Sequence, residues 1–386
     1  MLEMTSLGPF LQKNADGKVP SLRKIYADGR VPSLRTTNNV GDLMSIFSKD
    51  LGIDLGTANV VVYAEGKGIV LREPSVVAVD KNTGKILKVG AAARNMLGRT
   101  PGNVAALRPL REGVVSDYEM TERMLAEFFR RIFKYSFVKP RVVISVPSGI
   151  TSIEERAVVQ IAQEAGARRV YLIEEPLAAA LGANLSFEGP DGHMVVDIGG
   201  GTTDIGVLTM NGLANSASIK VAGDNFDEAI IRYLRKKHGL IVGQTIAEET
   251  KITIGTVCER EEPVETLVKG RDFKTGLARE ISVSSGDMLE ALRRPARQIT
   301  DAIMEVLEQT TPELVADIAR NGIVLTGGGA QIWGMDKLIT ERTGIQCTVA
   351  DDADSCVAYG CGKSLGWINR MQEGPINFAR RKLLKE

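Results

Sequence analysis

The sequence has few of the residues that metal centres and disulfide frameworks require. Its 386 residues include four cysteines and two histidines, and no two cysteines form a CxxC pair. A structural zinc site is therefore not expected. Scattered cysteines in a chain of this length are typical of reduced thiols, which favours a cytosolic protein.

Long apolar runs and an excess charge of one sign are also missing. No apolar stretch approaches the ~18 residues of a transmembrane helix, and no signal peptide is expected. Lys plus Arg and Asp plus Glu number 48 each. The sequence therefore predicts no net attraction to nucleic acid or anionic membranes, although a local basic patch stays open.

The two ends of the chain differ from the rest. Residues 1–44 are polar and contain a near-repeat, ADGKVPSLR followed by ADGRVPSLR. Little periodic hydrophobicity is present there, which predicts a disordered extension. Whether this extension belongs to the working protein, which could begin at Met44, stays open. Residues 373–386 are basic and are expected to form a frayed tail.

The region between the ends has the pattern of an α/β protein. Buried strands are expected at 141–147 and 169–175, each followed by a helix. Residues 116–133 have helical spacing, with Ser116 or Asp117 as the N-cap. The order of three strands, helix, strand and helix occurs twice. Because the chain is also long for one core, two related halves are predicted.

Glycine-rich turns recur between apolar runs, in LGIDLGTANVVVY (51–63) and VVDIGGGTTDIGVL (195–208). Glycine permits positive φ and a close approach of ligand to backbone, and successive N–H groups can bind an anion. Either turn alone could be an ordinary hairpin. Together with a third turn they predict a polyphosphate clamp. The turns are Gly56, Thr57, Ala58, Asn59; Gly199, Gly200, Gly201, Thr202, Thr203; and Gly327, Gly328, Gly329.

Carboxylates stand just before the first two turns. Asp54 and Asp197 each fall at the end of a strand that leads into the proposed clamp. Mg²⁺ binds few protein carboxylates and keeps several waters and substrate phosphates. These two residues are therefore predicted to hold Mg²⁺ through water.

One motif resembles a P-loop and is rejected. Gly362, Lys363 and Ser364 match the end of the Walker A pattern, but Val357 stands where its first glycine is required. No suitable buried strand leads into this stretch. Its small residues are expected instead to let a C-terminal helix pack closely.

Taken together, DLGTAN, IEEPLAAALG, VVDIGGGTTD, AGDNFDEAI and TGGGA resemble the actin, sugar-kinase and DnaK-type chaperone superfamily. KPRVVISVPSGIT and residues 87–120 are similar to the MreB family of bacterial actins. The resemblance covers roughly residues 46–372. It implies an α/β actin-like fold, with halves at 45–185 and 186–372 around a cleft for ATP and Mg²⁺. Smaller subdomains are expected at about 77–140 and 223–294.

The resemblance also implies roles for particular residues. Glu175 in IEEP matches the residue that positions the attacking water, and strand alternation directs Glu174 to the other side. A salt bridge is the alternative for one of this pair. Glu248 and Lys251 match adenosine contacts. The complete nucleotide set comprises the three turns with Gly223, Asp224, Glu248, Glu249, Thr250, Lys251 and Ala330.

A membrane contact is implied at FKYSFVKP, residues 133–140. MreB-like proteins insert an apolar loop here, and aromatic residues beside lysines suit the bilayer interface. A helix end packed on its own core is the alternative. The expected insertion residues are Phe133, Tyr135, Phe137 and Val138, assisted by Ile46 and Phe47.

The function implied by the resemblance is an ATPase whose filaments organise cell-wall synthesis and maintain rod shape. It would lie in the cytoplasm at the inner face of the cell membrane. The implied partners are further copies of the chain, MreC, MreD, RodZ and wall-synthesis enzymes, without nucleic acid. The alternative is a non-polymerising ATPase, either an FtsA-like membrane adaptor or a small-molecule kinase. The choice among MreB paralogues, and between ATP and GTP, stays open.

Overall fold

The computed structural model describes residues 50–133 and 139–366. The predicted extension, the basic tail, and Ile46 and Phe47 lie outside the described residues. Within the described part of the chain, no helix is long and apolar enough to cross a membrane.

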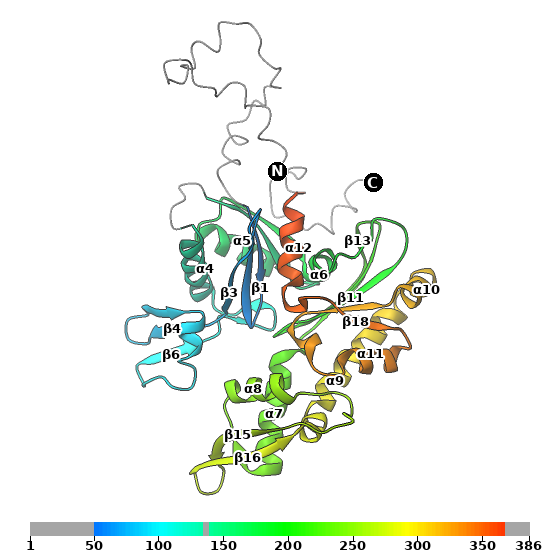
Figure 1. Cartoon of the computed structure of the whole chain (residues 1–386). Coiled ribbons are helices and arrows are strands. Elements are labelled where there is room, and N and C mark those ends of the chain that lie inside the picture. Colours follow the sequence, from blue (N-terminus) through cyan, green and yellow to red (C-terminus); the bar gives the residue numbers. More distant parts are fainter. Residues whose placement is uncertain (1–49, 134–138, 367–386) are drawn as a thin grey trace, which may run out of the picture. The chain divides into compact units, whose positions relative to one another are not determined.

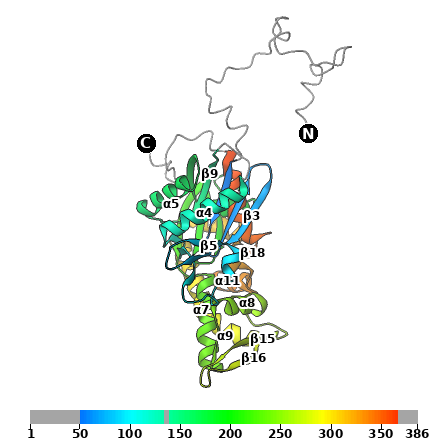
Figure 2. The same ribbon diagram turned by 90° about the vertical axis from the view of Figure 1, so that its left-hand side faces the viewer.

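The first large sheet has five strands in the order β10-β9-β1-β2-β3. β1 pairs antiparallel with β2 and parallel with β9. Apolar side chains alternate between its faces: Val142 and Ile144 pack with α4 and α5, and Val143 packs with α6 and α12. Figure 2 shows α4 and α5 lying over one side. The elements are β1 (Leu51–Leu55), β2 (Asn59–Ala64), β3 (Gly68–Pro74), α4 (Tyr118–Ile132), β9 (Arg141–Val146), α5 (Ser152–Glu164), β10 (Arg169–Glu174), α6 (Glu175–Gly182) and α12 (Cys356–Ser364).

The second large sheet repeats this arrangement, with five strands in the order β18-β17-β11-β12-β13. Its apolar face packs against α7, α9 and α11. The two sheets thus share one topology, as the repeated order of elements in the sequence indicates. The elements are β11 (His193–Ile198), β12 (Thr203–Thr209), β13 (Gly212–Ile219), α7 (Gly223–His238), α9 (Ser285–Glu308), α10 (Pro312–Asn321), β17 (Ile323–Thr326), η3 (Gly328–Gln331), α11 (Met335–Thr343), β18 (Cys347–Val349) and η4 (Ala353–Ser355).

Two smaller sheets of three strands each accompany the large ones, in the orders β5-β4-β6 and β14-β15-β16. Both lie inside the ranges proposed for smaller subdomains. α4 falls in the first of these ranges, but its apolar side packs into the core of the first large sheet. Its N-cap is Asp117, which accepts from the Met120 N–H. The remaining elements are β4 (Val77–Asp80), β5 (Ile86–Val89), α3 (Ala91–Arg94), β6 (Val104–Leu107), β7 (Leu110–Arg111), β8 (Val114–Val115), β14 (Leu240–Ile241), α8 (Gln244–Ile254), β15 (Glu265–Asp272) and β16 (Ala278–Ser284).

α12 and α6 pack side by side between the two large sheets (Figure 1). A Cβ added at Gly360 would lie 1.7 Å from the Ala178 carbonyl oxygen, so only glycine permits this approach. The expectation of close packing by small residues is confirmed. Lys363 donates to the Leu181 carbonyl at 2.6 Å and to Asn184 Oδ1 at 2.6 Å, so it caps α6 and serves no phosphate loop.

Candidate functional site

A cavity of about 310 Å³ lies where the elements of the two large sheets meet. Its size falls within the range of small-molecule sites. Side chains and backbone from both halves line it. The lining residues are Asp54, Gly56, Thr57, Ala58, Asn59, Val61, Arg72, Gly113, Glu175, Asp197, Gly199, Gly200, Gly201, Thr202, Gly223, Asp224, Asp227, Glu248, Lys251, Ile252, Gly327, Gly328, Gly329, Gln331, Ala353, Asp354 and Val357.

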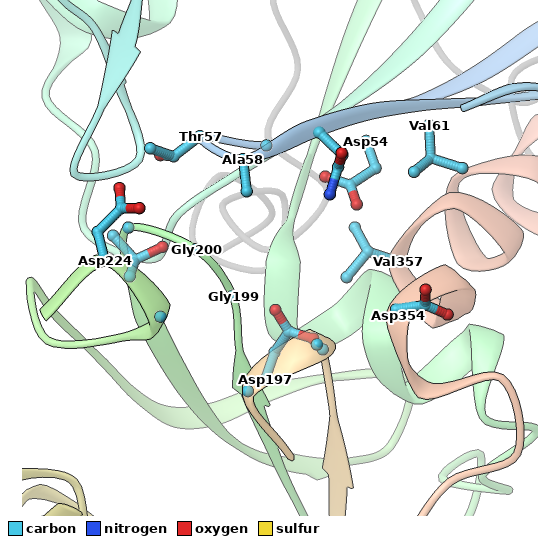
Figure 3. A pocket seen from close by; sticks show the side chains of 18 of the residues that line it. Asp54, Thr57, Ala58, Val61, Asp197, Gly199, Gly200, Asp224, Asp354 and Val357 are labelled. Carbon is cyan, nitrogen blue, oxygen red and sulfur yellow. The ribbon is translucent and has the colours of Figure 1, made fainter. Parts of the chain in front are cut away.

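The first two glycine turns face each other at one side of this cavity (Figure 3). A Cβ added at Gly200 would lie 2.7 Å from the Ala58 Cβ, and one at Gly201 would lie 2.5 Å from Thr57 Oγ1. The turns therefore approach as closely as glycine allows. Thr57 Oγ1 accepts from the Gly113 N–H at 3.0 Å, which fixes its position. The two turns together offer backbone N–H groups to an anion.

The N-terminus of α7 is hydrogen-bonded to the second glycine turn. The Gly223 N–H donates to the Gly199 carbonyl at 3.1 Å, and the Asp224 N–H donates to the Gly200 carbonyl at 2.8 Å. The positive end of the helix dipole is thereby directed toward the cavity, where it favours negative charge. Lys251 lies beside this helix, 2.8 Å from Asp227, and places a cation at the cavity wall.

Asp54 and Asp197 extend into the cavity from β1 and β11 (Figure 3). Burial raises the pKa of each carboxyl to about 7; the charge of Asp197 adds to the shift at Asp54, and that of Asp204 adds to the shift at Asp197. Thr326 Oγ1 donates to Asp197 Oδ1 at 2.7 Å. Two desolvated carboxyls around a cavity fit a divalent cation. No group of three or more His, Cys, Asp or Glu residues in the described ranges is arranged to hold a metal directly.

Glu175 is the first residue of α6 and lines the same cavity. It hydrogen-bonds to Asp204, whose Oδ1 accepts from the Ser148 N–H at 2.9 Å. Burial, followed by the charges of Asp204, Asp197 and Asp54, raises the pKa of Glu175 well above its ordinary value. Glu174 does not line the cavity; its Oε2 accepts from Ser148 Oγ at 3.0 Å. The two neighbouring glutamates thus reach different environments.

Asp204 is an ionisable group that the sequence reasoning missed. It lies in β12, where all seven residues are buried. Burial raises its pKa, while hydrogen bonds from Ser148 and Glu175 oppose that shift. A carboxylate within an otherwise apolar or small-residue strand is costly to bury. An aspartate among the apolar and small residues of VVDIGGGTTDIGVL is therefore the sequence feature that could have identified Asp204.

Four residues of the predicted nucleotide set do not line the cavity: Thr203, Glu249, Thr250 and Ala330. Thr203 Oγ1 donates to the Val221 carbonyl at 2.7 Å, and Thr250 Oγ1 donates to the Ile246 carbonyl at 2.7 Å. Ala330 is buried in the core of the second large sheet. Glu249 is exposed, because neighbouring positions on a helix project in different directions.

Several cavity residues carry no local sequence signal. Arg72 in β3 pairs with Asp354 and also donates to Ser355 Oγ in η4. This contact joins strand β3 of the first large sheet to the segment that precedes α12. The other cavity residues outside the predicted set are Val61, Gly113, Asp227, Ile252, Gln331, Ala353 and Val357.

Only the first residue of the proposed membrane loop is described. The Phe133 ring is half-buried and lies edge-on to Phe129, with 6.5 Å between ring centroids. It packs against the core of the first large sheet. Tyr135, Phe137 and Val138 lie outside the described residues.

Comparison with known proteins shows the family and agrees with this fold. The sequence model of the MreB/Mbl protein family matches residues 48–373. The cell shape-determining protein Mbl of Bacillus cereus is 49% identical over 327 residues, covering 84% of this chain and 98% of Mbl. The cell shape-determining protein MreB of Escherichia coli K12 is 48% identical over 330 residues, covering 84% of this chain and 95% of that protein.

Solved structures show the same architecture. MreB5 of Spiroplasma citri bound to ADP is 37% identical and superposes with a TM-score of 0.80 over 84% of this chain and 98% of that one. A second structure of that protein holds AMPPNP. The MamK double helical filament, at 23% identity and a TM-score of 0.72, shares the fold. The predicted α/β actin-like fold is confirmed, and the chain belongs to the MreB/Mbl family.

Proposed function

We propose that this chain is a polymerising bacterial actin that binds and hydrolyses ATP and determines cell shape. The observation that carries the proposal is the cavity, in which two facing glycine turns, a helix N-terminus and a cluster of buried carboxyls converge. Relatives named as cell shape-determining proteins share 48–49% sequence identity with it. The solved Spiroplasma citri relative binds ADP and AMPPNP.

In this proposal the phosphates of ATP lie between the turns at 56–59 and 199–202. Their N–H groups and the α7 N-terminus would bind the phosphate oxygens. Glu248, Lys251 and Ile252 would lie at the nucleoside, with 327–329 beneath the base. Asp54 and Asp197 would hold Mg²⁺ through water. When bound, Mg²⁺ neutralises charge on the phosphates.

Glu175 would orient the water that attacks the terminal phosphate. Its hydrogen bond to Asp204 lets the two carboxyls hold one proton between them. One carboxyl oxygen of the pair thus stays available to accept from water. Asp204 has no room to turn away, because it is fully buried and fixed by the Ser148 N–H.

Filament formation would follow from closure of the two halves around ATP, and hydrolysis would weaken the filament. The filaments would lie at the inner face of the cell membrane, where Tyr135, Phe137 and Val138 insert. There they would organise wall synthesis with MreC, MreD, RodZ and the wall-synthesis enzymes. The sequence supports the membrane contact through aromatic residues that alternate with lysines.

The test is electron microscopy of the purified chain with ATP and Mg²⁺, with and without liposomes that contain anionic lipid. Filaments that line the liposomes would support both the polymer and the membrane loop. A Tyr135→Ser/Phe137→Ser variant is the matched control, expected to polymerise in solution but not on liposomes. Filaments in solution alone for the unaltered chain would contradict the membrane contact. Nucleotide binding without filaments would contradict polymerisation and favour an FtsA-like adaptor. In a separate assay, stimulation of ADP release by glucose or glycerol would favour a small-molecule kinase.

A further inference from the structure

Besides Arg72 with Asp354 and the more exposed pair of Lys220 with Glu112, two ion pairs join the two halves beside the cavity. Arg94, at the end of α3, lies 2.7 Å from Glu248 in α8. Arg108, just after β6, lies 2.6 Å from Asp224 in the first turn of α7. Each arginine comes from the part of the chain that carries the first large sheet, and each carboxylate comes from the part that carries the second.

These pairs are shielded from solvent more than ordinary surface pairs. The side chains of Arg108 and Asp224 are 13% and 29% exposed, and those of Arg94 and Glu248 are 33% and 18% exposed. By contrast, Arg232 and Glu228 within α7 are 68% and 62% exposed. Because shielding reduces screening by water, the two pairs across the halves should stabilise more than the pair within α7.

Both carboxylates also line the cavity. Within the described ranges, Arg94 is the one cation that forms an ion pair with Glu248, and Arg108 is the one that does so with Asp224. Asp224 accepts one further, longer bond of 3.4 Å from Gln244 Nε2. The arginines of the first half therefore determine how two cavity side chains of the second half are oriented.

We propose that Arg94 and Arg108 are positioning residues that close the cleft over the bound nucleotide and slow its release. A nucleotide held between the halves can leave by their separation only after both ion pairs break. When they are intact, Glu248 and Asp224 are held toward the nucleotide. This inference rests on the proposed function, because it takes a nucleotide as the ligand of the cavity.

Stopped-flow release of a fluorescent ATP analogue, mant-ATP with Mg²⁺, chased by unlabelled ATP, tests this inference on the full chain. Arg94→Ala should release the analogue about tenfold faster, equivalent to about 1.4 kcal/mol. Arg94→Lys, which keeps the charge, should recover most of the slow release. Arg232→Ala is the matched control, since it removes an ion pair that does not join the halves, and its release rate should be unchanged.

Single-turnover hydrolysis of prebound ATP provides the second readout. A positioning role in closure predicts faster release in Arg94→Ala with a hydrolysis rate within about threefold of the unaltered chain, a difference of under about 0.7 kcal/mol. If Arg94→Ala releases the analogue at the unaltered rate, or if Arg94→Lys is as fast as Arg94→Ala, the inference is overturned while the proposed function stands. If the unaltered chain does not bind mant-ATP, the proposed function fails and the inference fails with it.

Discussion

The two large sheets each carry a carboxylate at the same strand-to-helix junction, but the two carboxylates have different surroundings. In each sheet the outermost parallel strand leads into a helix that packs between the halves: β10 into α6, and β18 through η4 into α12. Glu175 stands at the first junction and Asp354 at the second, and both line the cavity. The shared topology therefore brings a carboxylate to the cavity from each half.

The difference lies in how the two carboxylates are compensated. Asp354 is paired with Arg72, and their side chains are 42% and 41% exposed. Glu175 is 8% exposed, and no Lys or Arg of the described residues pairs with it. A paired carboxylate at the cavity rim stabilises the fold, whereas an unpaired buried one costs stability and remains available for chemistry. This difference supports the catalytic role proposed for Glu175 and favours a structural role for Asp354.

The largest expected effect comes from Glu175→Gln. Loss of the carboxylate that is proposed to orient water should lower ATP hydrolysis by about 10²- to 10⁴-fold, with nucleotide affinity within a few-fold. Phosphate release in a single turnover measures the effect. Glu174→Gln is the adjacent control, expected to keep most of the activity because Glu174 does not line the cavity. An unchanged hydrolysis rate in Glu175→Gln would contradict the proposal that Glu175 is catalytic and would remove its functional difference from Asp354.

Asp197→Asn should weaken Mg²⁺-nucleotide binding by roughly 10- to 100-fold. The same change should stabilise the nucleotide-free protein, because an amide is cheaper to bury than a carboxylate and still accepts from Thr326 Oγ1. Calorimetric titration with ATP and Mg²⁺, and thermal unfolding in EDTA, measure the two effects. Equal affinity in both proteins would show that Asp197 has no part in binding the cation.

The nucleotide-free protein should lose stability as the pH rises. The pKa of Asp54 and of Asp197 is about 7 in the folded protein, whereas an aspartate in the unfolded chain has a pKa of about 3.8. Between these values the unfolded chain has released the protons that the folded chain retains. The free energy of unfolding should therefore fall from about pH 4 to pH 7 and then level off, with an upper bound of about 4 kcal/mol for each carboxyl. Urea unfolding in EDTA measures it, and Asp197→Asn should flatten the slope; an identical slope would contradict the assignment.

The smallest effect is expected for Arg72→Ala. Its pair with Asp354 is two-fifths exposed, so the loss of unfolding free energy should be under about 1 kcal/mol. Hydrolysis should stay within a few-fold. Chemical denaturation and steady-state phosphate release measure both quantities. A loss of activity as large as that of Glu175→Gln would show that the second junction also participates in the chemistry.

The sequence predicted the features that depend on neighbouring residues. The glycine turns, Asp54 and Asp197 could be found because each turn interrupts apolar runs within a few positions. The repeated order of strands and helices predicted two related halves, and the two large sheets have the same strand order. Asp117 was one of two proposed caps, and its side chain does cap α4.

Features that depend on distant contacts could not be predicted in this way. Arg72 and Asp354 are 282 positions apart, so no local pattern joins them. Thr203 follows Thr202 in the same turn, yet its hydroxyl is used by the Val221 carbonyl. Asp204 stands in a buried strand, and its partner Glu175 comes from the other half. Each depends on a contact with a residue outside its own local motif, which that motif does not encode.

The most direct test of the account is an experimental structure of the chain with AMPPNP and Mg²⁺. We expect phosphates between Gly56–Asn59 and Gly199–Thr202, a cation whose waters contact Asp54 and Asp197, and the terminal phosphate facing Glu175. A nucleotide bound outside this cavity, or one whose terminal phosphate lies away from Glu175, would contradict it.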